Sequence, residues 1–149
     1  PIISANFGAG QHQRIKQTLR YAIFASLSFA AVWTVFCMSF PTQIVGALMK
    51  ATPEVLAISP TIVRLYSLSF ILLPLNVFST YYFQSLMKPN AAFCISIARG
   101  AVISGALILI LPLIFNANGV WLAMPLTEAI VCFGTVYFMR KYTKELNKA

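Results

Sequence analysis

The sequence predicts an all-α integral membrane protein with four transmembrane helices. Hydrophobic residues make up 59% of its 149 residues and charged residues only 9%, whereas a soluble domain carries about 25% charged residues. Residues 21–40 and 65–87 contain no Asp, Glu, Lys or Arg, and residues 91–115 and 119–139 contain one charge each. Each stretch reaches the length of about 20 residues that a helix needs to cross the hydrocarbon core. A soluble protein with a buried core would need a polar exterior, which this sequence does not contain.

The segments between the apolar stretches set the expected order of elements. We expect spans over residues 21–40, 60–87, 91–115 and 119–139, an outer amphipathic loop over 41–59 and a tail over 140–149. Pro74 should kink the second span, because proline removes one backbone hydrogen bond. The loop over 41–59 is half-apolar and is interrupted by Lys50 and Glu54, which predicts a short interfacial helix or a loop on the outer side.

The net charge of +8 is concentrated at one side of the predicted spans. Basic residues precede the first span, occupy the turn after the second and follow the fourth: Arg14, Lys16, Arg20, Lys88, Arg140, Lys141, Lys144 and Lys148. Cytoplasmic loops carry such an excess of Lys and Arg. The pattern therefore predicts a multi-pass protein of the plasma (inner) membrane with both chain ends cytoplasmic. It also argues against a nucleic-acid partner, which would require a basic patch on a soluble domain.

Three polar residues recur at four-residue spacing in the second span. Asn76, Thr80 and Gln84 share one helix face, because side chains four residues apart lie above one another. Such a stripe beside the Pro74 kink is typical of a helix that lines a water-filled cavity. It is equally typical of interhelical contacts, in which amides and hydroxyls bond to neighbouring helices. Both interpretations stay open at this point, and the three residues are candidates for the transport path.

Glu128 and Arg99 are the charges inside the third and fourth spans. A carboxylate near the bilayer centre costs several kcal/mol and usually faces the bundle interior or a water-filled cavity. Arg99 lies roughly 12 Å above the cytoplasmic start of its span, and Glu128 roughly 16 Å above the cytoplasmic end of the next. The similar depths predict an ion pair. A titrating or substrate-facing carboxylate is the alternative, as is an arrangement in which each charge has another partner.

The sequence shows no pattern typical of an enzyme or a metal site. His12 is the single histidine, so a catalytic triad and a zinc site with histidine ligands lack their residues. The three cysteines lie inside predicted spans and are interpreted as small apolar residues rather than disulfide partners. We expect no enzymatic activity, no metal and no cofactor.

Three longer segments resemble the multidrug and toxic-compound extrusion (MATE) exporters. "PIISANFGAGQHQRIKQTLRYA" resembles the end of the eighth helix, its basic cytoplasmic loop and the start of the ninth helix, with Pro1, Asn6, Phe7, Gly8, Ala9 and Gly10 in the family's positions. "FQSLMKPNAAFCISIARG" resembles the junction of helices ten and eleven, with Phe83, Gln84, Lys88 and Arg99. "GVWLAMPLTEAI" resembles the start of helix twelve, with Gly119, Trp121, Pro125 and Glu128. The "MKPN" turn departs from the more usual Gly-Lys turn.

This resemblance implies a secondary transporter built from two six-helix lobes. The chain would be the last third of such a protein, with four helices of the second lobe, and its partners would be the missing N-terminal lobe and the lipid bilayer. The activity implied is the export of small cationic or amphiphilic substrates in exchange for H⁺ or Na⁺. Many members place a coupling acid in the first lobe. The equivalent of the tenth helix has no acid here, which argues against a sodium site on that helix.

Two further functions remain as alternatives. A flippase for lipid-linked saccharides, or for other lipids, of the same wider superfamily would share the helices but usually needs a more basic cavity. Arg99 alone could supply that charge inside the bilayer, which favours drug export. A scaffold subunit without transport activity is the other alternative, and the polar stripe at Asn76, Thr80 and Gln84 argues weakly against it.

Overall fold

The computed structural model describes residues 1–146, and these residues form helices and turns without a strand. The elements are α1 (Ile2–Gly8), α2 (His12–Ser39), α3 (Pro41–Leu48), α4 (Pro53–Ser67), the 3₁₀ segment η1 (Leu68–Ile71), α5 (Leu73–Ser85), α6 (Pro89–Ile97), the π-helical segment η2 (Ala98–Val102), α7 (Ile103–Phe115) and α8 (Ala117–Glu145). The expected tail residues 147–149, Lys148 among them, lie outside the described residues.

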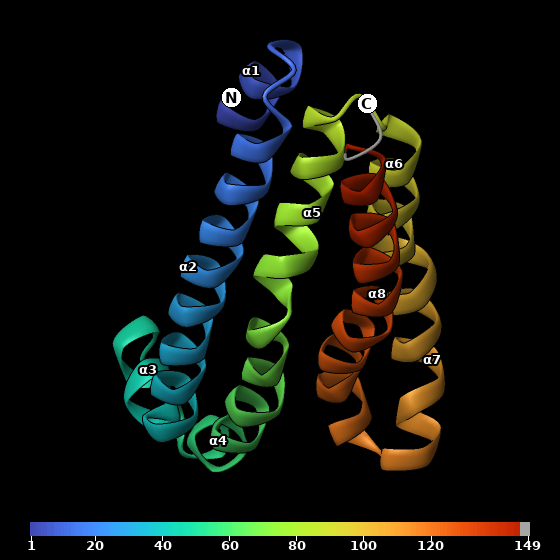
Figure 1. Ribbon diagram of the computed structural model, residues 1–149. Coiled ribbons are helices and arrows are strands. Elements are labelled where there is room, and N and C mark those ends of the chain that lie inside the picture. The colour runs from blue at the N-terminus through green and yellow to red at the C-terminus, as the bar shows by residue number, and fades with distance from the viewer. Residues whose placement is uncertain (147–149) are drawn as a thin grey trace.

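Four helical columns are long and apolar enough to cross a membrane. They are α2, the column from Pro53 to Ser85, the column from Pro89 to Phe115, and α8. Figure 1 shows them running side by side, with α1, the α5–α6 turn and the end of α8 at one end, and α3 and the α7–α8 turn at the other. The predicted all-α membrane fold with four spans is confirmed. The end of α8 returns to the side at which α2 begins, as an even number of spans requires.

The helices begin and end at different residues from those expected. The helix α2 starts at His12, so Arg14, Lys16 and Arg20 lie on the helix rather than in a loop. Likewise α8 continues to Glu145, so most of the expected tail is helical. Lys and Arg are good helix formers, and their long side chains can reach the membrane surface from a helix end. The basic residues therefore do not mark the ends of the helices.

The second and third columns are interrupted inside the membrane. At the expected kink the α-helix is interrupted, because η1 has the tighter 3₁₀ geometry. Pro74 lies in the first turn of the next helix, α5. There its missing N–H costs no helical hydrogen bond. The third column contains the π-helical segment η2, which includes Arg99. Neither the 3₁₀ segment nor the π-helical segment follows from the hydrophobic pattern.

The connections on the opposite side are short. The segment expected as a loop or interfacial helix contains α3 and the start of α4, where the Thr52 side chain accepts a hydrogen bond from the Val55 N–H (3.4 Å). Between α7 and α8 only Asn116 is non-helical, with φ +52°. Gly119 lies so close to α7 that a Cβ atom there would overlap the backbone carbonyl of Leu111. A side chain at residue 119 would therefore push α7 and α8 apart.

Buried residues form two groups of opposite chemistry. The apolar cluster contains Ile3, Ile15, Leu19, Tyr82, Phe83, Leu86, Ala91, Ala92, Ile95, Val131, Met139 and Leu146. The polar seam contains fully buried side chains where the end of α4, η1, α5 and α8 meet: Ser67, Ser69, Asn76, Ser79, Thr127, Glu128 and Thr135. Most of the apolar cluster belongs to the end of the molecule that carries α1 and the α5–α6 turn, whereas the seam runs deeper along the helices (Figure 1).

Candidate intramembrane polar site

Glu128 is the centre of the polar seam. It lies in the middle of α8 and is 0% exposed. Arg99 donates a hydrogen bond from Nη1 to Glu128 Oε1 (3.1 Å). Asn76 donates from Nδ2 to Glu128 Oε2 (2.7 Å) and also contacts the Glu128 backbone carbonyl (2.9 Å). Both carboxylate oxygens thus accept a hydrogen bond from a donor on another column.

The irregular segments of the two neighbouring columns place these donors. Asn76 lies in the first turn of α5, just after the η1 break, so the break sets the direction in which its amide approaches α8. Arg99 lies in η2, and π-helical turns of this kind often occur at functional sites. An α-helical path through the same residues would rotate Arg99 relative to α8. The geometry of the site therefore depends on two departures from the regular helix.

Burial of this site is asymmetric. The Glu128 side chain is enclosed, whereas the Arg99 side chain is 30% exposed. A lone carboxylate at this depth would be strongly disfavoured, and the guanidinium compensates its charge while still reaching the surface of the helix group. The arrangement can hold a carboxylate in a nonpolar medium.

The three residues of the predicted stripe share a face but lie at different depths. Asn76 is buried against α8, Thr80 is half-buried and donates to the Asn76 backbone carbonyl (3.2 Å), and Gln84 is exposed. Asn76 therefore has the geometry of an interhelical contact. The structure brings Asn76 together with Arg99 and Glu128, and it leaves Gln84 exposed. The role of these residues in a transport path stays a prediction.

The contact between Asn76 and Glu128 was not predicted from the sequence, although a signal for it existed. Asn76 lies eleven residues before residue 87, and Glu128 lies eleven residues before residue 139, the predicted ends of their spans. The two spans run in the same direction, so equal distances from their ends place the two residues at the same depth, which is a condition for contact. Two oxygens of the seam, Asn76 Oδ1 and Thr135 Oγ1, have no hydrogen-bond partner among the described residues.

The MatE family profile matches residues 1–110 of the chain. The chain belongs to the MatE family. No curated protein sequence matches it. Within residues 1–146, no group of His, Cys, Asp and Glu side chains could hold a metal ion.

Solved structures of transporters share the fold of this MatE chain. It superposes on the outward-facing conformation of a multidrug resistance MATE family transporter with a TM-score of 0.90, and on the inward-facing conformation of such a transporter with 0.88. A crystal structure of MATE in complex with MaL6 gives 0.89. Sequence identity is 16% in each case, and 99% of this chain is covered. The chain spans about a third of the length of these proteins, 33–34%.

Proposed function

We propose that this chain is the C-terminal part of the second lobe of a secondary transporter that exports cationic or amphiphilic compounds in exchange for H⁺ or Na⁺. In this proposal the four columns correspond to the last four of twelve helices, and both ends of the chain face the cytoplasm. Membership of the MatE family and the fold shared with MATE transporters support it. The coupling ion and the substrate class are part of the proposal.

The main support for the proposal is that the chain fits the outward-facing and the inward-facing conformation of a transporter almost equally well. The chain matches an outward-facing and an inward-facing transporter almost equally well, with TM-scores of 0.90 and 0.88 over 99% of its length. A segment that rearranged internally during transport would fit one conformation much worse than the other. Alternating access in such folds is largely a rocking of one repeat or bundle against another. The four columns therefore have the property expected of a rigid part of a moving lobe.

The ion pair of Arg99 and Glu128 favours drug export over saccharide flipping. A flippase for lipid-linked saccharides would need unpaired positive charge to bind the phosphates of its substrate. Arg99, the cation deepest in the third column, instead donates to Glu128. Its charge is compensated, so this part of the lobe presents a nearly neutral interior to a substrate.

Transport is tested with the complete transporter in inverted membrane vesicles. Export predicts that ethidium accumulates in the vesicles when a pH or Na⁺ gradient is imposed, and that it leaves when the gradient is collapsed. The fragment 1–149 alone should not accumulate the dye, because it lacks the other lobe. Gradient-driven accumulation by the fragment, or none by the complete protein under either gradient, would contradict the proposal.

The predicted cavity-lining role is tested by thiol accessibility in the complete transporter with its native cysteines replaced by serine. Because exposure rises along the stripe, a polar thiol reagent should react fastest at Gln84→Cys, more slowly at Thr80→Cys and slowest at Asn76→Cys. Leu72→Cys, on a half-buried apolar position, is the control. Protection of all three stripe positions would leave only the interhelical role.

Orientation is tested with an impermeant label applied to intact cells. Lys144→Cys and Asn118→Cys lie at opposite ends of α8, so only the cysteine at residue 118 should react from outside. Reaction at both, or at residue 144 alone, would overturn the proposed topology.

A further inference from the structure

Both side chains that donate hydrogen bonds to the Glu128 carboxylate come earlier in the chain than Glu128 itself. Asn76 precedes it by 52 residues and Arg99 by 29. A protein is synthesised from its N-terminus, so the second and third columns are made before α8 is. Glu128 is therefore the last of the three side chains to reach the membrane, and both of its donors are present when it enters.

The helix α8 is the column least suited to enter a membrane alone. It is the least hydrophobic of the four columns, and the third column is the most hydrophobic. The one charge within residues 119–139 is Glu128, and a charge at the centre of a helix strongly opposes insertion of that helix into a bilayer. The Glu128 side chain is too short to reach the membrane surface from its depth. A partner for this carboxylate therefore favours the entry of α8.

Arg99 can be accommodated in the membrane before Glu128 arrives. Its column is the most hydrophobic of the four, and its long side chain can extend toward the cytoplasmic surface, which lies roughly 12 Å away along the helix. In the folded chain the Arg99 side chain is still 30% exposed, whereas that of Glu128 is fully buried. The basic member of the pair thus tolerates the bilayer alone better than the acidic member does.

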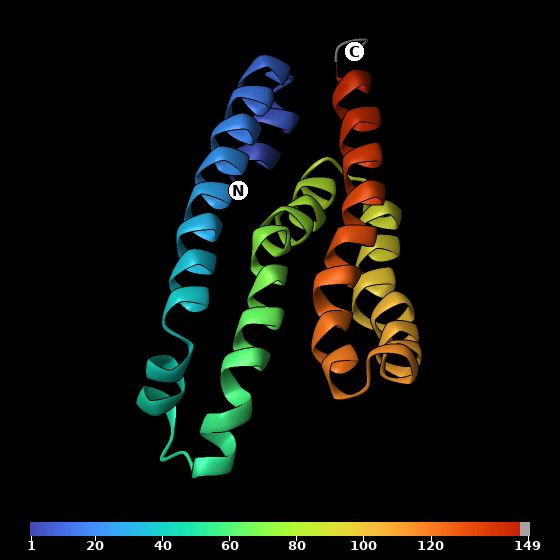
Figure 2. The same ribbon diagram turned by 90° about the horizontal axis from the view of Figure 1, so that it is seen from below.

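The connection between α7 and α8 brings the two charges together as soon as α8 is made. Asn116 is the one non-helical residue between the two helices, and Gly119 packs against the Leu111 backbone. Figures 1 and 2 show α7 and α8 side by side from this turn onward. So tight a hairpin places α8 against the third column, which carries Arg99.

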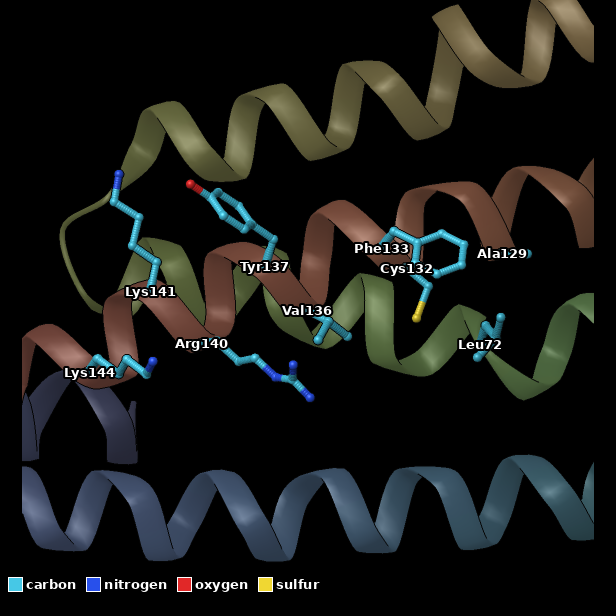
Figure 3. A pocket seen from close by; sticks show the side chains of 9 residues that line it. All are labelled: Leu72, Ala129, Cys132, Phe133, Val136, Tyr137, Arg140, Lys141 and Lys144. Atoms are coloured by element: carbon cyan, nitrogen blue, oxygen red, sulfur yellow. The ribbon is translucent and has the colours of Figure 1, made fainter.

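The basic end of α8 favours one direction of entry but supplies no partner for Glu128. Arg140, Lys141 and Lys144 lie at the end of α8 that is away from Ala129, the neighbour of Glu128 in the chain (Figure 3). Such clusters favour the cytoplasmic side of a membrane. At about 1.5 Å per residue, Arg140 lies roughly 18 Å beyond Glu128 along the helix, too far to compensate its charge. The countercharge for Glu128 has to come from another column.

We propose that Arg99 is the insertion partner of α8, and that α8 enters the membrane against the third column as the ion pair of Arg99 and Glu128 forms. The proposal rests on the proposed orientation, in which both chain ends are cytoplasmic. Replacing Arg99 by leucine makes the third column more apolar, and yet it should impair the insertion of the helix that follows. When α8 does not insert, its basic end stays on the outer side, where the third column ends.

The test uses the complete transporter with Lys144→Cys as its single cysteine and an impermeant thiol reagent applied to intact cells. A brief radioactive pulse restricts the measurement to newly made protein, before unfolded molecules are degraded. Residue 144 of this parent protein should stay protected until the cells are lysed. Arg99→Leu should lower the ratio of protected to labelled residue 144 by about 100-fold, which corresponds to the insertion penalty of one charge near the centre of a helix. Adding Glu128→Gln to Arg99→Leu should restore protection, and Arg99→Lys should retain it, because lysine keeps the charge.

Glu128→Gln alone separates insertion from stability. It breaks the same ion pair but leaves no acid at this depth of α8, so it should lower stability and leave residue 144 protected. Arg20→Leu is the matched control, because it removes the same side chain and charge from an exposed position on α2, and it should also leave residue 144 protected. Protection in Arg99→Leu, labelling in Glu128→Gln, or equal labelling in Arg20→Leu and Arg99→Leu would each overturn the proposal. Labelling of residue 144 in the parent protein would instead refute the proposed orientation.

Discussion

The apolar cluster and the polar seam hold the same helices together by different forces. The cluster is built from side chains such as Ile15, Phe83 and Leu86, all 2% exposed or less. The seam contains equally buried serine, threonine, asparagine and glutamate side chains. Lipid tails are as apolar as leucine, so apolar contact between helices gains little in the middle of a bilayer, and packing and hydrogen bonds replace it. The apolar cluster lies toward one end of the helices, where water is close. Burial of apolar surface area is therefore favourable there.

The comparison predicts which property of a side chain matters in each region. In the cluster, volume and shape should decide stability, because cores tolerate changes that conserve them. In the seam, charge and hydrogen bonding should decide it, even where the volume is kept. Four experiments test this difference, in order of decreasing expected effect.

The largest effect is expected at Glu128, where a change of almost no volume removes a charge. Glu128→Gln should destabilise the fold by about 3–5 kcal/mol, because it leaves the Arg99 guanidinium without its anion. Combining it with Arg99→Gln should recover part of the loss. The folded fraction in mild detergent and steric trapping in bicelles measure both.

A coupling carboxylate would behave differently from a structural one. If Glu128 carried the coupling ion, Glu128→Gln would abolish transport at normal folded yield, and Arg99→Gln would restore nothing. That outcome would refute the structural role of the pair and would assign the seam to the transport mechanism.

Asn76 provides the second test. Asn76→Leu keeps most of the volume and makes the site more apolar, yet it should cost about 1.5–3 kcal/mol, the range for a hydrogen bond to a charged group. The effect should shrink in a Glu128→Gln, Arg99→Gln background, where no charge remains. An equal cost in both backgrounds would show that packing, and not the donation to Glu128 Oε2, explains the contact. Steric trapping of the four variants gives this coupling energy.

The sequence predicted the spans well and the site only in part, and the reason differs between the two. The spans could be predicted because long apolar runs, such as residues 21–40, are stable in the hydrocarbon core of a bilayer and not in water. The depth of Arg99 and Glu128 follows from counting residues, which is why their proximity could be expected. The direction of Asn76 depends on η1, and that of Arg99 on η2. Pro74 marks the position of the first irregular segment but not its 3₁₀ geometry, and hydrophobic periodicity marks neither segment.

A smaller effect is expected where a hydrogen bond lies at the edge of the apolar cluster. The Tyr82 hydroxyl is 2.8 Å from Thr143 Oγ1, and the ring packs beside Phe83. Tyr82→Phe keeps the ring and should cost about 0.5–1.5 kcal/mol, the typical net value of a neutral hydrogen bond. Thr143→Val should cost about the same, and the double variant no more than either. A cost of Tyr82→Phe as large as that of Glu128→Gln would mean that the two regions do not differ as described. Thermal unfolding of the purified protein measures the series.

The smallest effect is expected at the second ion pair, Lys88 with Glu145, which has the chemistry of the Arg99–Glu128 pair without its burial. The two side chains are 43% and 45% exposed, and Lys88 also lies 5.2 Å above the Tyr142 ring. Exposed pairs contribute about 0.2–1 kcal/mol, because water already solvates both charges. A double-mutant cycle with Lys88→Gln and Glu145→Gln should give a coupling energy in that range.

The coupling energy of this exposed pair should fall as the salt concentration is raised, since exposed charges are screened and buried ones are screened much less. The Arg99–Glu128 coupling should barely respond to salt. An equal salt dependence for both pairs would show that water reaches Glu128 as freely as it reaches Glu145, and the seam would then be a wet cavity rather than a buried contact.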